Sequence, residues 1–164
     1  MENKIVLEKL HTQFGEHIKN PIESFGMLTI ETSKENFLDV LKFMRDDAVL
    51  QFNFMTDLCG AHYPDREQKF EVIYHMHSWV NNVRVRIKVA LNGEVPKIPT
   101  ACFEFPTANW MERETYDFYG IIFEGHPNLK RILNVDDLAV FPMRKEFPLE
   151  DNTRTDKRDD MFGR

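Results

Sequence analysis

Cysteine is scarce in this sequence of 164 residues, which contains only Cys59 and Cys102. Their wide separation excludes a Cys-x-x-Cys pair, a zinc knuckle and the four thiolates that hold an iron–sulfur cluster. We expect both to be small buried hydrophobic residues, because a reducing compartment disfavours a structural disulfide.

Glycine-rich phosphate loops and long apolar runs are also missing. The seven glycines are scattered, and they form neither a dinucleotide-binding fingerprint nor a Walker sequence, so we expect no cofactor-binding site in the chain. No apolar run reaches the length that a bilayer requires. The first residues lack the basic and apolar regions of a signal peptide, which predicts a cytoplasmic protein.

What is present is the composition of an ordinary globular protein, with 42% hydrophobic and 29% charged residues. The length suits one domain with a substantial core. A net charge of −6 repels a phosphate backbone, which argues against nucleic acid unless the basic residues are segregated.

Helical spacing of apolar residues predicts a short helix over 6–14 and a second helix over 37–44. Thr32 and Glu35 have the spacing of a capping box for the second helix. A strand containing a glycine is predicted between the two, over 24–31.

Three extended segments follow, over 49–61, 69–78 and 81–91, and the short turns between them predict an antiparallel meander. The third segment alternates. One face receives Val83, Val85, Ile87 and Val89, and the other receives Arg84, Arg86 and Lys88. We expect a helix to cover the first face, while the second face is exposed to solvent or contacts a partner.

A third helix is predicted over 108–119, with Thr107 as its cap and Gly120 as its left-handed stop, and 121–123 is predicted as a short strand. The fold class is therefore α+β, with an open antiparallel or mixed sheet and helices on one side. We predict one domain over 1–135 and an extended C-terminal docking arm over 136–164, where prolines and charges leave little to bury.

Two candidate sites involve histidine. His75 and His77 lie two apart on one strand and could bind a metal together, although polar residues on the wet face of a strand are the favoured interpretation. Glu114, Asp117 and His126 could form a general acid/base set or a carboxylate metal site, as in a free-standing metal-dependent hydrolase.

Arg113 argues against that hydrolase. It can pair with Asp117 at i+4, and a guanidinium lowers the pKa of nearby carboxyl groups, which suits them poorly to proton transfer at neutral pH. Trp110 and Glu114 share the helix face with Asp117, and the pattern favours a salt-bridge network. The stripe of Arg84, Arg86 and Lys88 remains a candidate for nucleic acid, anionic lipid or an acidic neighbouring protein.

The charged helix and the turn after it resemble the signature of a known family. Glu112-Arg113-Glu114 is followed at fixed spacing by Asp117, two aromatics, His126, Lys130 and Ile132-Leu133. This pattern resembles the C subunit, or 30-kDa subunit, of the proton-pumping NADH-quinone oxidoreductase, respiratory complex I. The segments "DLCGAHYPDREQKFEVIYHMHS", "VPKIPTACFEFPTANW" and "FPMRKEFP" extend the resemblance from about Ser24 to Pro148, with Met143 where leucine is more usual.

The resemblance implies a peripheral-arm subunit on the cytoplasmic side of the cell inner membrane, attached to the membrane only through the complex. FMN and iron–sulfur clusters would lie in other subunits. The D, B and I subunits of complex I would be its neighbours, with quinone reached indirectly through the D subunit. The equivalent subunit of a membrane-bound nickel–iron hydrogenase is the alternative. The implied site is an interface without catalytic residues, formed by Glu112, Arg113, Glu114, Asp117, His126, Lys130, Arg131, Arg144 and Lys145.

Overall fold

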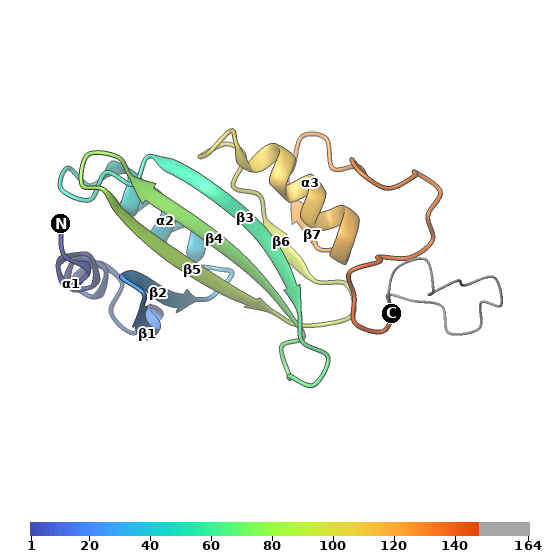
Figure 1. Cartoon of the computed structure of the whole chain (residues 1–164), viewed down its shortest axis with the longest axis horizontal. Coiled ribbons are helices and arrows are strands. Elements are labelled where there is room, and N and C mark those ends of the chain that lie inside the picture. Colours follow the sequence, from blue (N-terminus) through green and yellow to red (C-terminus); the bar gives the residue numbers. More distant parts are fainter. Residues whose placement is uncertain (148–164) are drawn as a thin grey trace, which may run out of the picture.

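The computed structural model describes residues 1–147 and contains an open sheet with helices packed along it (Figure 1). In chain order the elements are α1 (Asn3–Phe14), the 3-10 turn η1 (Gly15–His17), β1 (Lys19–Ser24), β2 (Met27–Thr32), α2 (Phe37–Asp46), β3 (Phe54–His62), β4 (Phe70–Ser78), β5 (Val83–Leu91), β6 (Lys97–Pro99), α3 (Ala108–Tyr119) and β7 (Ile122–Glu124). Over this part of the chain, none of the helices has the length and apolarity needed to cross a bilayer.

Within residues 1–147 the main sheet has five strands, in the order β1-β2-β5-β4-β3. Strands β3, β4 and β5 form the predicted antiparallel meander. Strand β2 pairs in parallel with β5, from Leu28 opposite Val85 to Thr32 opposite Val89, so the sheet is mixed. Strands β6 and β7 form a separate two-stranded parallel sheet. The α+β prediction is confirmed.

One face of the main sheet carries the core. The alternating valines and isoleucine of β5 are buried as predicted, and α1 and α2 contribute Val6, Leu10, Phe37 and Val40 to the same hydrophobic cluster. Helix α3 packs on this face too, because Gly60 of β3 lies against Thr115 and Tyr119 of α3. All three helices therefore lie on one side, and within residues 1–147 the opposite face of the sheet carries no helix.

Two N-terminal predictions are wrong. The segment 24–31 is divided by a turn at Phe25 and Gly26, both with positive φ, which makes β1 and β2 a hairpin. Strand β1 could not be recognised because all six of its residues are exposed and give no alternation. Thr32 does not cap α2: it ends β2, and the helix begins after Asn36, whose side chain makes no capping bond.

The later helix boundaries agree with the sequence. Helix α3 spans 108–119, and Gly120 follows it with φ of 72°, although the hydroxyl of Thr107 makes no capping bond. The strand β7 lies one residue beyond the predicted 121–123. Strand β3 begins only at Phe54, because residues 48–50 form a turn after α2.

Residues 138–147, which we call the strap, run back along the domain. The N–H of Met143 donates to the carbonyl of Phe118, and the guanidinium of Arg144 donates to the carbonyl of Tyr119. The division of the chain at residue 135 stays a prediction. The part of the predicted arm over 148–164 lies outside the described residues.

Candidate functional site around helix α3

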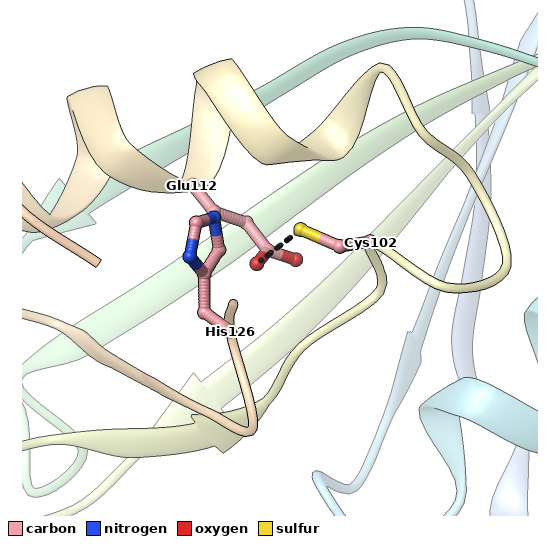
Figure 2. A group of neighbouring side chains, drawn as sticks. All are labelled: Cys102, Glu112 and His126. Atoms are coloured by element: carbon pink, nitrogen blue, oxygen red, sulfur yellow. Dashed lines mark hydrogen bonds between the residues drawn. The ribbon is translucent and has the colours of Figure 1, made fainter. Parts of the chain in front are cut away.

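Glu112 is fully buried on the inner side of α3 (Figure 2). One carboxylate oxygen accepts the N–H of Ala101 at 2.7 Å, and the other accepts the Thr100 hydroxyl at 2.5 Å and the Cys102 thiol at 3.2 Å. Burial raises the pKa of Glu112, and these hydrogen bonds oppose the rise. The side chain thus attaches α3 to the loop that follows β6.

His126 lies beside Glu112, and each ring nitrogen has a main-chain neighbour. Nδ1 accepts the N–H of Asn128 at 3.0 Å, so Nε2 carries the proton and donates to the carbonyl of Asn109 at 3.1 Å. The histidine therefore joins the Gly-His-Pro turn to the start of α3, which is a positional role.

Cys102, Glu112 and His126 offer ligand atoms within 4.8 Å of one another, and no other group of this kind occurs among residues 1–147. Their chemistry fits a metal poorly. Burial raises the pKa of the Cys102 thiol to about 12, and the thiol donates its hydrogen to Glu112. Both oxygens of Glu112 and both nitrogens of His126 already have protein partners. We interpret the group as a polar network within the fold.

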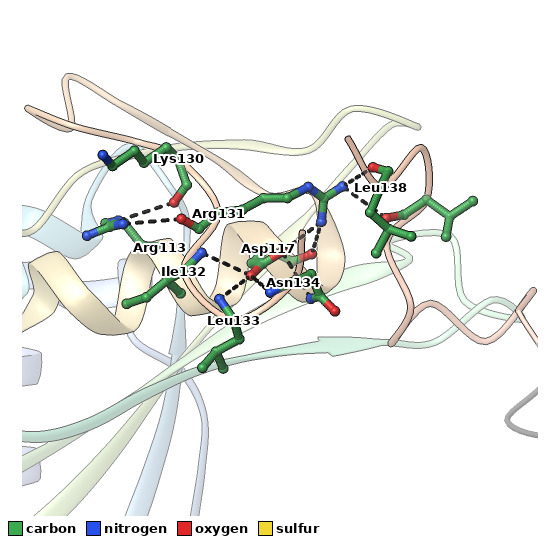
Figure 3. A network of polar contacts seen from close by, with 9 residues as sticks. Arg113, Asp117, Lys130, Arg131, Ile132, Leu133, Asn134 and Leu138 are labelled. Carbon is green, nitrogen blue, oxygen red and sulfur yellow. Dashed lines mark hydrogen bonds and ion pairs between the residues drawn. The ribbon is translucent and has the colours of Figure 1, made fainter. Parts of the chain in front are cut away.

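Asp117 is the centre of the second network (Figure 3). It is fully buried, and its carboxylate accepts the N–H groups of Ile132, Leu133 and Asn134 at 2.8–3.1 Å. The Asn134 amide and the Arg131 guanidinium complete the set, at 3.0 and 2.7 Å. Burial by itself would raise the pKa of Asp117, but these donors outweigh it and hold the pKa well below its usual range.

Arg113 does not pair with Asp117, contrary to the i+4 prediction. Its side chain is buried and donates to the carbonyls of Lys130 and Arg131, both at 3.2 Å (Figure 3). Its guanidinium lies 5.0 Å from the Trp110 ring. The turn after Lys130 supplies both the acceptors for Arg113 and the donors for Asp117. Main-chain groups 15 to 18 residues away thus replace the neighbour on the helix.

The hydrolase set is not assembled. Glu114 is exposed, Asp117 lies under the 131–134 turn, and His126 faces Glu112. Within the described chain no hydrogen bond or ion pair joins these three residues. The helix face shared by Trp110, Glu114 and Asp117 is covered only at its C-terminal end, which explains why its members differ so much in exposure.

The basic residues of the predicted interface differ in the contacts that their side chains make. Arg131 spans the Asp117 carboxylate and the carbonyls of Leu138 and Val140, which fixes the start of the strap (Figure 3). The guanidinium of Arg144 lies 4.9 Å from the rings of Phe70 and Phe141. The side chains of Lys130 and Lys145 are exposed, and only their main chains bind within the described domain.

The paired histidines of β4 lie on the helix-free face, and in the described chain they take no part in a group of three metal-ligating residues. His75 accepts a hydrogen bond from Arg86 at 2.9 Å, and its other nitrogen lies 3.3 Å from Asp57. Burial and then Arg86 lower the pKa of His75. Lys88 pairs with Glu71 at 3.5 Å. Two of the three cations of the β5 stripe are therefore engaged within the sheet.

Sequence reasoning missed several partners at this site: Thr100, Ala101, Cys102, Asn134 and His62, whose Nδ1 accepts the Lys145 N–H at 2.9 Å. Three of these contacts use main-chain groups or a thiol, which carry no spacing signal. The charged signature covers the helix and turn in which these buried contacts lie, but it did not identify what each side chain binds.

The sequence matches, over residues 30–153, the family described as the 30-kDa subunit of respiratory-chain NADH dehydrogenase. The C subunit of a NADH-quinone oxidoreductase from Roseiflexus sp. is 42% identical over 91% of this chain and 86% of its own length. The protein of the same name from Rhizobium leguminosarum bv. trifolii is 44% identical, over 87% of this chain and 72% of its own.

Solved structures share the fold. The trypsin-resistant fragment of Nqo5 superimposes with a TM-score of 0.66 at 31% identity, covering 79% of this chain and 100% of the fragment. A chain of the membrane-bound sulfane sulfur reductase, an archaeal respiratory membrane complex, superimposes with a TM-score of 0.78 at 20% identity, covering 89% and 85%. At that identity the second likeness concerns the fold alone.

Proposed function

Because the chain belongs to the family of the 30-kDa subunit, or C subunit, of respiratory complex I, we propose that it acts as a scaffold within that oxidoreductase and performs no chemistry itself. The redox reaction from NADH to quinone would proceed in neighbouring subunits. This chain would hold those neighbours in position.

The state of the signature carboxyl groups carries this proposal. Glu112 and Asp117 are fully buried, and their oxygens accept hydrogen bonds from the loop before α3 and the turn after β7. A group that serves in proton transfer must reach its substrate. These groups instead fix two loops to one helix. A surface that binds a partner needs loops held in a fixed position in this way.

The finer assignments follow from the same family membership. We propose that FMN and the iron–sulfur clusters are bound by other subunits, and that the D, B and I subunits of complex I are the protein neighbours, with quinone met only through the D subunit. The chain would lie on the cytoplasmic side of the cell inner membrane and attach to it through the complex. Nucleic acid is not expected as a partner, since Arg86 and Lys88 are paired within the sheet.

The alternatives have less support. The assignment as a hydrogenase subunit depends only on a module that the two complexes share. The curated relatives are named as NADH-quinone oxidoreductase subunits. The hydrolase requires Glu114, Asp117 and His126 to converge, and each of them lies in different surroundings.

The test is a strain whose own copy of the gene is replaced by a tagged copy. The complex is solubilised gently and purified through the tag, its subunits are identified by mass spectrometry, and its inhibitor-sensitive NADH-to-quinone activity is measured. We expect subunits that bear flavin and clusters to accompany the chain. Recovery of the chain alone, or with a hydrogenase large subunit, would contradict the proposal.

A matched pair of variants separates a structural role of the signature from a chemical one. Asp117→Asn should reduce the amount of assembled complex, while the activity per assembled complex stays unchanged. Glu67→Gln, at an exposed carboxyl group outside the predicted interface, should change neither quantity. A fully assembled Asp117→Asn complex without activity would instead place Asp117 in the reaction.

A further inference from the structure

One end of the main sheet carries an exposed apolar cluster, which we call the aromatic corner and define as Val49, Phe54, Trp79 and Val80. Their exposed fractions are 48%, 37%, 64% and 69%. They come from three neighbouring places: the turn after α2, the start of β3 and the turn between β4 and β5, all at the upper left of Figure 1.

Contacts hold this corner together. The Phe54 and Trp79 rings lie 5.7 Å apart, and His77, the cross-strand neighbour of Phe54, lies 4.9 Å from Trp79. The side chain of Asn81 donates to the carbonyls of Val49 and Leu50, which ties the two turns to each other. These contacts hold the exposed rings in place at the end of the sheet. A cluster of exposed apolar side chains of this kind is typical of an interaction site.

A cation without a partner in the described chain adjoins the corner. Arg84 lies opposite His77 in the register of β4 and β5, on the helix-free face. It is exposed and forms no hydrogen bond or ion pair with the described residues, whereas Arg86 and Lys88 along the same strand are paired. Beneath Trp79, the Nε2 atom of His77 is buried and has no hydrogen-bond partner within residues 1–147.

Aromatic residues and arginine are the side chains that contribute most binding energy at protein interfaces. An anionic lipid surface attracts clusters of about four to eight basic residues. Arg84 shares a surface hollow with one lysine, Lys4, and with the acidic Glu2 and Glu23, on a chain of net charge −6. The charge and shape thus favour a protein over a membrane.

We propose that the aromatic corner and Arg84 form a docking site for a neighbouring protein subunit that presents an acidic side chain beside an apolar one. The carboxylate pairs with Arg84, and the apolar side chain packs on Trp79 and Phe54. This inference rests on the proposed scaffold function, and it adds which surface is used and what chemistry the partner offers there.

The first experiment places a photo-crosslinking amino acid at Val80 of the tagged full chain, in the purified native complex. We expect a crosslink to a peptide of another subunit that has an aspartate or glutamate within a few residues of the attached position. Val95 is the control position, because it is 59% exposed but follows β5 at the opposite end of that strand. A complex recovered intact with no crosslink from Val80, or with a crosslink to lipid, would overturn the docking site.

The second experiment reverses the charge. With tagged variant and untagged wild-type chains co-expressed, Arg84→Glu should lower incorporation into the complex about tenfold, as expected when a carboxylate meets a like charge. Lys34→Glu, at the other end of β2, should leave incorporation unchanged. Arg84→Glu should match wild type in thermal unfolding of the chain alone, since Arg84 has no partner to lose among the described residues.

Changing the crosslinked partner carboxylate to lysine should restore incorporation of Arg84→Glu. Equal incorporation of the two charge variants would refute the role of Arg84, although the complex itself would remain intact. Failure of the wild-type chain to enter any complex would refute the scaffold function, and the docking site with it. The two failures are therefore distinguishable.

Discussion

Replacing Asp117 with asparagine removes one charge and keeps the side-chain shape. The carboxylate accepts five hydrogen bonds, from three main-chain N–H groups, the Asn134 amide and Arg131. An asparagine must turn its NH₂ group toward either the three N–H groups or the other two donors. Each orientation opposes donor to donor, so no rotamer restores the network.

The expected loss of unfolding free energy at pH 7 is about 3–5 kcal/mol, the range for removing one partner of a buried ion pair. Arg131 and Asp117 are both buried side chains, at 9% and 0% exposure, so solvent screens the pair weakly. A loss of this size approaches half the total stability of many domains, which lies at about 5–15 kcal/mol.

The loss must depend on pH. The folded pKa of Asp117 is lowered, because burial, which would raise it, is outweighed by the three main-chain N–H groups and Arg131. The carboxylate therefore contributes stability that is fully present above the unfolded pKa of about 3.9 and disappears as the pH falls through the folded value. The free-energy difference between wild type and Asp117→Asn should be constant between about pH 5 and 8 and shrink below about pH 4.

Urea unfolding followed by circular dichroism measures this difference, with the denaturant dependence compared between variants. Glu114→Gln is the control and should change the free energy of unfolding by less than about 0.5 kcal/mol, because Glu114 is exposed. An Asp117→Asn variant within about 1 kcal/mol of wild type at pH 7 would mean that the 131–134 turn is held by other contacts.

Three further outcomes can be measured on the same chain. Gly120→Ala should lower the free energy of unfolding by more than the roughly 1–2 kcal/mol that a left-handed alanine costs, because its Cβ would lie 2.5 Å from Phe141. Proteolysis of the strap should also become faster. Gly26→Ala is the control and should show the backbone cost alone, because its Cβ would meet no described atom within 4 Å. Gly60→Ala should cost about 1–3 kcal/mol by urea unfolding, since its Cβ would lie 2.7 Å from a side-chain atom of α3. Burial raises the pKa of both thiols, and it raises that of Cys102 to about 12. A thiol reagent at pH 8 should therefore modify half-buried Cys59 before buried Cys102, as followed by mass spectrometry. The reverse order of modification would contradict this arrangement.

The sheet could be predicted where burial alternates. Strand β5 shows the pattern in its sequence, and Gly120 marks the end of α3 by its freedom at positive φ. Strand β1 could not be found in this way, because a fully exposed edge strand has no buried face to impose a period. The parallel pairing of β2 with β5 could not be predicted either, because the local spacing of residues does not encode which distant strands pair.

The sequence drew attention to helix α3, but the contacts of its charged side chains were not foreseen. Helical spacing favoured Arg113 as the partner of Asp117, yet main-chain groups of the following turn were the stronger partners, because they must be satisfied once buried. Glu112 stands in a run of charged residues that would be expected in solvent. Its burial depends on three donors from residues 100–102, which only the folded loop brings together.

The parallel pairing of β2 with β5 has a consequence for synthesis of the chain on the ribosome. Thr32 finds its partner Val89 only after the whole meander has been translated, a wait of several seconds at about 5–20 residues per second. Until then the β1–β2 hairpin presents an unoccupied hydrogen-bonding edge to solvent. The nascent N-terminus is therefore the segment that a chaperone would have most reason to hold, and its insertion beside β5 is the step that completes the sheet.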